Sequence, residues 1–297
     1  MLISACLSIV FAVAEPVEIR YKMDLDEPLR YIYEDVTENR TSAMDQTTTV
    51  VTETRVTTRT ERIEARDDGS LILRSTTERV ASKIEGPGVS LEFDSDDEDF
   101  EQRRKDPTVA SIAGTLDISV KLHMTPDGEI LGVPNMNEIN KMLDSVPDPA
   151  VKQGLMLMLN EQSLIAMNEA NYAMLPEEPV EIGDSWNREI DIPMGGGPVI
   201  TIDARGSLED IERLGERRVA VISLDGALRT ETLQGGVRIK ITASDLSGTM
   251  RFDIGGGFLR SLEMESESTL EGTSTMDGSV VVTQNLTQTI SMSLIEP

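Results

Sequence analysis

Apolar and polar residues alternate over most of the chain, with the period of two that turns one face of a β-strand toward a core. Residues 112–124 show this most clearly, because their apolar members share one parity: Ile112, Leu116, Ile118, Val120, Leu122 and Met124. Residues 47–65 are rich in threonine and valine, and β-branched side chains favour the pleated surface of a sheet. Further strand patterns follow at residues 187–192, 199–204, 219–224, 237–252, 258–269 and 280–295. We therefore predict a mainly β protein built on a long antiparallel sheet.

One strand–turn–strand unit recurs along the chain. Aligning Gly128 with Gly256 matches the apolar residues Ile118, Leu122, Met124, Ile130 and Leu131 with Leu246, Met250, Phe252, Phe258 and Leu259. The recurrence predicts two related β-halves, residues 15–134 and 176–297, around a helical insertion at residues 135–175. The expected fold is of the α+β class, a curved sheet that wraps the helices in one compact unit.

Residues 135–172 are the only stretch with a clear helical pattern. Ile139, Met142, Leu143 and Val146 have helical spacing. Asp148 can then cap a second helix whose first position suits Pro149, since no N–H is needed there.

On this second helix, four apolar residues lie on overlapping turns and should point at the concave side of the sheet: Leu155, Met158, Leu159 and Ile165. Two interpretations stay open for this methionine-rich face. It is either core packing or an adaptable surface for an apolar ligand or partner, and in the second case these four residues are the candidate ligand-binding residues.

The helical stretch ends in the segment Leu175-Pro-Glu-Glu-Pro-Val-Glu-Ile-Gly-Asp-Ser-Trp186. Trp186 is the only tryptophan. We predict that it is a structural anchor that packs the helix end onto the second β-half, with a binding pocket formed together with Tyr172 as the alternative.

Residues 1–14 have the features of a secretory signal peptide. A short apolar run ends in Ala12-Val-Ala14 before Glu15, an A-x-A cleavage site, and the run is too short to span a bilayer. We therefore expect an exported protein, periplasmic or secreted. Cys6 lies in a lipobox-like tetrapeptide, so a lipid anchor is the alternative.

The net charge of −26 argues against a general attraction to nucleic acid or anionic membranes, which require basic patches. The acidic run at residues 94–101 lacks the glycine and the distal glutamate of a calcium loop, and we interpret it as a surface loop, with a cation site as the alternative. His123 is the only histidine, and the cysteine at position 6 falls in the predicted signal segment. We predict no catalytic residue, no metal site and no cofactor.

Three segments carry a resemblance to a known group of proteins: residues 21–31, the Pro-Val-Glu-Ile-Gly-Asp-Ser-Trp motif at 179–186 and the hairpin at 252–260. They resemble an uncharacterised family of exported bacterial β-rich proteins, and the resemblance implies an envelope or secreted protein without known catalytic residues. At the level of fold, long antiparallel strands that wrap helices are similar to the half-barrel of periplasmic lipoprotein carriers.

These observations favour a non-enzymatic envelope protein that binds or carries an apolar small molecule, a lipid or a lipid-modified partner. A structural or interaction protein of the envelope with a filled core, recognising another envelope protein, is the alternative, and a hydrolase is a third hypothesis. An apolar cavity beside the helices would favour the carrier, whereas a polar cleft with converging carboxylates would favour the enzyme.

Overall fold

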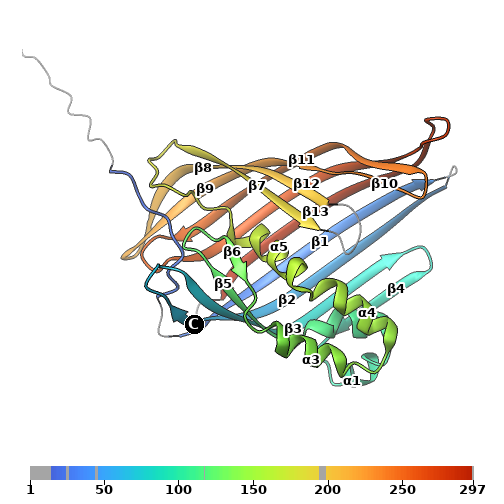
Figure 1. Ribbon diagram of the computed structural model, residues 1–297, viewed down its shortest axis with the longest axis horizontal. Helices are drawn as coiled ribbons and strands as arrows, with labels where there is room; N and C mark the ends of the chain where they lie inside the picture. Colours follow the sequence, from blue (N-terminus) through green and yellow to red (C-terminus); the bar gives the residue numbers. More distant parts are fainter. Residues whose placement is uncertain (1–14, 25–26, 44–45, 117, 194–198, 296–297) are drawn as a thin grey trace, which may run out of the picture.

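A single antiparallel sheet organises the computed structural model, which describes residues 15–24, 27–43, 46–116, 118–193 and 199–295 (Figure 1). Within these ranges the sheet has thirteen strands. They are β1 (Leu29–Ala43), β2 (Gln46–Ala65), β3 (Leu71–Gly86), β4 (Val89–Asp94), β5 (Ser119–Met124), β6 (Ile130–Gly132), β7 (Ser185–Pro193), β8 (Val199–Leu214), β9 (Arg217–Arg229), β10 (Glu231–Gln234), β11 (Val237–Asp253), β12 (Phe258–Ser274) and β13 (Val280–Ile295). The prediction of a mainly β fold with central helices and one long, curved antiparallel sheet is confirmed. The predicted signal segment, including Cys6, lies outside the described residues.

The strand order shows how the two ends of the chain meet. From edge to edge it is β6-β5-β3-β2-β1-β13-β12-β11-β9-β8-β7, while β4 pairs with β3 and β10 with β11. β1 and β13 therefore lie side by side in the middle, in a register that runs from Arg30 opposite Ile295 to Ser42 opposite Thr283. The helical stretch from residue 136 to residue 172 connects β6, at one edge, with β7, at the other. The division into two β-halves stays a prediction.

Five α-helices are found among the described residues: α1 (Phe100–Arg103), α2 (Pro107–Ile112), α3 (Met136–Asp144), α4 (Pro149–Met158) and α5 (Glu161–Tyr172), with a 3-10 turn η1 (Ala113–Thr115) after α2. Asp148 accepts hydrogen bonds from the backbone N–H groups of Ala150 and Val151, as the sequence predicts for a cap. The second predicted helix is in fact two helices: α4 ends at Met158, and Asn160 caps α5 by accepting a hydrogen bond from the N–H of Ser163. α5 contacts both β6 and β7, and so lies between the two edges of the sheet (Figure 1).

The acidic run at residues 94–101 is an exposed turn over residues 96–99, between the end of β4 at Asp94 and the start of α1 at Phe100, whose side chain is buried. One local prediction was wrong. Residues 112–124 do not form one strand, since Ile112 ends α2 and β5 begins only at Ser119. Phe100, together with Val109 of α2, packs on Phe93 of β4 in a small second core. This burial of side chains over β3 and β4 explains why the short helices form.

The N-terminal segment, residues 17–24, closes one end of the fold. Alternate side chains, those of Val17, Ile19, Tyr21 and Met23, are buried in the main core. The N–H of Tyr21 donates to the carbonyl of Pro126 over 2.7 Å, and that of Lys22 donates to Gly257 over 3.0 Å. The segment thus bridges the two turns that the sequence repeat aligned.

The side chains at the repeat match in part. Leu122, Met124 and Ile130 are buried, as are their counterparts Met250, Phe252 and Phe258. Leu131, however, is 49% exposed, whereas its counterpart Leu259 is buried. The difference follows from position, because β6 is an edge strand and β12 is central.

The outer face of the sheet is solvated and charged. In β1, Tyr31 is buried on the inner face, whereas Glu34 and Glu38, which have the opposite parity, are exposed. An antiparallel sheet can leave one face solvated in this way.

Candidate ligand cavity

A cavity of about 790 Å³ lies between β5, α2, α3 and α4. Its wall is largely apolar, with Ala110, Leu116, Ile118, Ile139, Met142, Val146, Val151 and Leu155 among the lining residues. The volume is within the range of about 300–1,000 Å³ that is typical of small-molecule sites.

Close packing of α4 against the segment that precedes β5 sets one side of this cavity. An ideal Cβ at Gly114 would lie 2.5 Å from Cδ2 of Leu155, so glycine allows the helix to approach this closely. An ion pair of 2.9 Å between Lys152 Nζ and Asp144 Oδ1 links α4 to α3. The apolar wall is therefore assembled from three helices that are held to one another directly.

The polar groups deep in the cavity are already satisfied. Asn135 is buried, its Oδ1 accepts from the N–H of Lys121 and its Nδ2 donates to the carbonyl of Ser119, each over 2.8 Å. Asp148, an exposed lining residue at the opening, accepts hydrogen bonds as the cap of α4. With these groups satisfied, the interior offers mainly dispersion contacts, which suit an apolar ligand.

The four predicted ligand-binding residues are divided by the structure. Leu155 lines the cavity, whereas Leu159 is buried in the core and Ile165 packs partly buried against it. Met158 is 42% exposed and does not point into the protein as expected. Sequence reasoning did not identify the wall formed by α2, although Asp106-Pro107 carries the same cap-and-proline signal as Asp148-Pro149.

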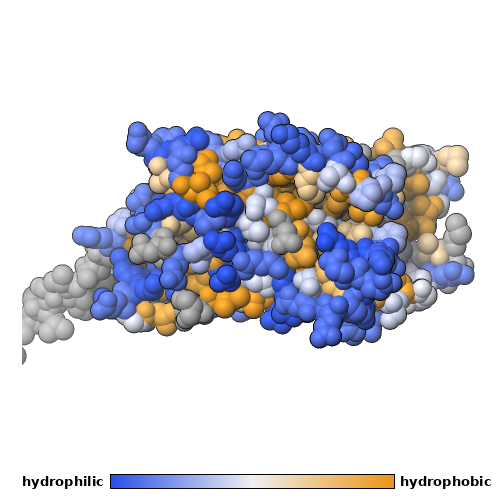
Figure 2. Space-filling model, turned by 90° about the horizontal axis from the view of Figure 1, so that it is seen from below, coloured by the Kyte–Doolittle hydropathy of each residue, from blue (hydrophilic) through white to orange (hydrophobic). Residues whose placement is uncertain are grey.

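The mouth of the cavity carries charged residues. Glu101, Arg104 and Lys105 line it from α1 and the turn that follows, and all three are exposed. Glu138 of α3 also lines it and lies 3.7 Å from Nζ of Lys121. The face of the molecule seen from below in Figure 2, toward the side where α1 and α3 lie in Figure 1, is mostly hydrophilic with scattered apolar residues.

One serine–histidine contact lies apart from this cavity. Nε2 of His123 is 3.0 Å from Oγ of Ser70, but it is also 3.1 Å from Nη1 of Arg66. Oγ of Ser70 donates to Asp68 over 2.7 Å, and this hydrogen bond lowers the pKa of Asp68. A catalytic triad requires the carboxylate on the histidine rather than on the serine, so this arrangement is a turn contact and not an activated nucleophile.

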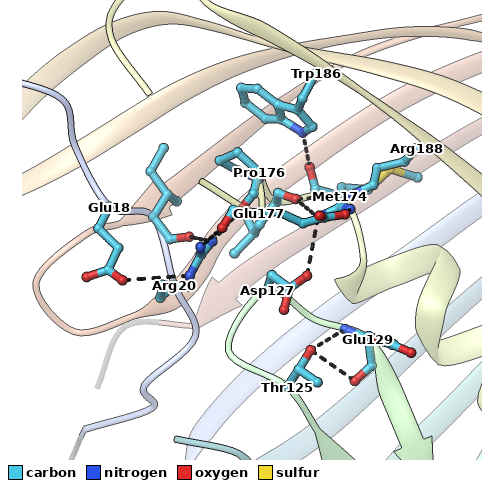
Figure 3. A network of polar contacts seen from close by, with 12 residues as sticks. Glu18, Arg20, Thr125, Asp127, Glu129, Met174, Pro176, Glu177, Trp186 and Arg188 are labelled. Atoms are coloured by element: carbon cyan, nitrogen blue, oxygen red, sulfur yellow. Dashed lines mark hydrogen bonds and ion pairs between the residues drawn. The ribbon is translucent and has the colours of Figure 1, made fainter. Parts of the chain in front are cut away.

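Trp186 and Arg188 of β7 fasten the end of the helical region to the sheet (Figure 3). Nε1 of Trp186 donates to the carbonyl of Met174 over 2.9 Å, and Nε of Arg188 donates to that of Leu175 over 3.0 Å. Nη2 of Arg188 also reaches Oδ2 of Asp127, in the β5–β6 turn, at 3.4 Å.

Arg20 joins the same network from the N-terminal segment. It donates to the carbonyls of Pro176 and Glu177, which belong to the segment between α5 and Trp186 (Figure 3). The network therefore ties together the N-terminal segment, the β5–β6 turn and β7. We refer to it as the edge network, and none of its residues lines the cavity.

Among the described residues, no helix has the length and apolar character needed to cross a membrane. No group of three or more histidine, cysteine, aspartate or glutamate side chains is placed to hold a metal ion in those same ranges.

Comparisons with known proteins place the chain in a family but assign it no activity. No curated protein matches it. Among solved structures, the chain is similar to lipovitellin, in a structure described for its lipid–protein interactions, with 6% identity and a TM-score of 0.48. The match covers 93% of this chain and 26% of the lipovitellin chain, so this chain spans about a quarter of the length of lipovitellin. Two further solved structures have lower TM-scores. The first is DynF from the dynemicin biosynthesis pathway of Micromonospora chersina, with 8% identity, a TM-score of 0.24, and coverage of 97% of this chain and 89% of DynF. The second is an outer-membrane channel from Pseudomonas putida F1, with 7% identity, a TM-score of 0.25, and coverage of 95% of this chain and 99% of the channel. Residues 68–285 match a family model, and the chain therefore belongs to the family of unknown function DUF6263.

Proposed function

We propose that this protein binds an apolar ligand in the cavity between β5, α2, α3 and α4 and serves as a non-enzymatic carrier in the cell envelope. The observation that carries the proposal is the cavity itself, about 790 Å³ with a mainly apolar wall. The cavity is open at its mouth, and an apolar occupant would remove its apolar wall from water and supply the dispersion contacts that close packing gives elsewhere. The envelope location rests on the predicted signal segment.

Filling the cavity tests the proposal. Ala110 of α2 lines the cavity and is partly buried, so Ala110→Phe should occupy the space that a ligand needs. We expect it to weaken binding of the neutral dye 1-N-phenylnaphthylamine by about tenfold or more, because the ligand and the new ring compete for one volume. Ala150→Phe introduces the same ring on an exposed position of α4 outside the cavity and is the matched control.

Circular dichroism separates loss of the site from loss of the fold. If Ala110→Phe does not fold, Met142→Gln is a second variant. Glutamine is nearly as long as methionine, and the change places an amide in the partly buried wall of the cavity. Dye affinity that is equal in the wild type and in both folded cavity variants would contradict the proposal. A wild-type protein that binds no dye would favour the structural or interaction role instead.

A further inference from the structure

The charges at the mouth of the cavity are not balanced by contacts within the protein. Nζ of Lys105 is 2.7 Å from the amide oxygen of Gln102, and no ion pair to Arg104 or Lys105 is found in the described part of the chain. Neighbouring Arg103, by contrast, pairs with Asp99 over 2.9 Å. The guanidinium group of Arg104 and the ammonium group of Lys105 at the mouth are thus available to a ligand.

The carboxylates around the same opening are largely committed. Asp148 accepts two backbone hydrogen bonds at the start of α4, and Glu138 faces Lys121 at 3.7 Å. Glu101 is the remaining acidic side chain at the mouth. Arg104 and Lys105 therefore lack an ion pair within the described residues, as does Glu101, while Asp148 and Glu138 keep their negative charge, in a chain whose net charge is −26.

Two opposite expectations follow for the head group of a ligand. The field of the whole chain favours a cation, whereas direct contact with the unpaired cations Arg104 and Lys105 at the mouth favours an anion. At physiological ionic strength the Debye length is about 8 Å, so groups in contact with the head group outweigh charges spread over the distant sheet.

We propose that the ligand is a single-chain amphiphile with an anionic head group, whose chain lies in the cavity and whose head is held by Arg104 and Lys105. This inference rests on the proposed function and names its ligand class. A guanidinium presents a planar set of donors that matches a carboxylate or a phosphate, and an adjacent ammonium adds a second charge. A free fatty acid and an anionic lysophospholipid share this chemistry.

Competition against bound 1-N-phenylnaphthylamine tests the head group separately from the chain. The competitors are tetradecanoate, tetradecan-1-ol and tetradecyltrimethylammonium, all with the same tail and used below their aggregation concentrations. We expect tetradecanoate to bind about three- to tenfold more tightly than the alcohol, as two partly exposed ion pairs allow, and the advantage to shrink as salt is added. In Arg104→Gln/Lys105→Gln the ratio of the two affinities should fall to about one.

A control variant removes the same charge elsewhere. Arg213→Gln/Lys240→Gln changes two exposed cations on β8 and β11, outside the cavity lining, and should keep the preference for tetradecanoate. The anionic lysolipid 1-tetradecanoyl-lysophosphatidylglycerol then distinguishes the two kinds of ligand. If it binds more tightly than tetradecanoate, the ligand is a lysophospholipid, and if it binds more weakly, the ligand is a free fatty acid.

The outcomes separate this inference from the proposed function. Equal affinity for acid and alcohol, or tighter binding of the ammonium, overturns the anionic head group while the carrier function stands. Failure of every competitor and of the dye overturns the carrier function itself. A preference for tetradecanoate that survives in Arg104→Gln/Lys105→Gln overturns the assignment of the head group to these two residues.

Discussion

Replacing Trp186 with alanine should be among the most destabilising single changes outside the main core. The indole covers Gly206 on the neighbouring strand, where an ideal Cβ would lie 2.6 Å from two ring carbons, and Nε1 donates to Met174 over 2.9 Å. The lost hydrogen bond contributes about 1 kcal/mol. The largely covered ring adds about 2–3 kcal/mol on the basis of measured large-to-small substitutions. We therefore expect Trp186→Ala to lower the free energy of unfolding by about 3–4 kcal/mol.

Urea unfolding followed by circular dichroism is the appropriate assay, because Trp186 is the only tryptophan and its fluorescence disappears in the variant. Trp186→Phe keeps a ring but no donor and should cost less than Trp186→Ala. A change within about 0.5 kcal/mol for Trp186→Ala, the usual range for surface positions, would refute the anchoring role.

Gly206 provides a double-mutant test of the same contact. Its φ is not left-handed, so the indole is the main obstacle to a side chain there. Gly206→Ala should cost about 1–3 kcal/mol in the wild type, as overpacking does, and less in Trp186→Ala. Strictly additive costs would show that the two residues are not coupled.

Two further predictions concern titratable groups. Burial raises the pKa of Glu169 on α5, and nearby Glu129 adds to the shift, so the ionised form is disfavoured in the fold. A raised folded pKa gives stability that is present at low pH and lost as pH rises through that pKa. Glu169→Gln should therefore be more stable than the wild type at pH 7 in urea titrations, with the difference fading toward about pH 4. The hydroxyl of Tyr21 is buried without a partner in the described structure, whereas that of Tyr31 donates to Leu259 over 2.9 Å. Tyr21→Phe should thus leave stability unchanged within about 0.5 kcal/mol or raise it, and Tyr31→Phe should cost about 1–3 kcal/mol; the opposite ranking in chemical unfolding would contradict this account.

The sheet could be predicted from the sequence because a half-buried antiparallel strand imposes a period of two on every residue it contains. The long patterns at β11, β12 and β13 extend over 16 or 17 residues each, so the signal is repeated many times. The paired helices were also readable, since Asp148-Pro149 combines a cap with a residue suited to the first turn.

The rest depended on tertiary contacts. α2 has six residues and α1 has four, too few to show a helical period, and their formation follows from the burial of Phe100 and Val109 over β3 and β4. Of the candidate site, Leu155 could be chosen from its helix, but the facing wall from α2 could not, because helical spacing does not reveal which neighbour a face meets. Met158 was wrongly expected to face inward for the same reason.

The edge network and the cavity occupy different parts of the fold and should be separable by experiment. The edge network joins the N-terminal segment, the β5–β6 turn and β7. The cavity lies among α2, α3, α4 and β5, and it shares no lining residue with the edge network. Substitutions at sites without shared partners are usually additive within about 0.3–0.5 kcal/mol. Trp186→Ala should therefore lower stability without changing dye affinity in the folded protein, and Ala110→Phe should change dye affinity without weakening the network. A coupling between the two would mean that α5, which spans the sheet edges next to α4, transmits the state of the cavity to the edges of the sheet.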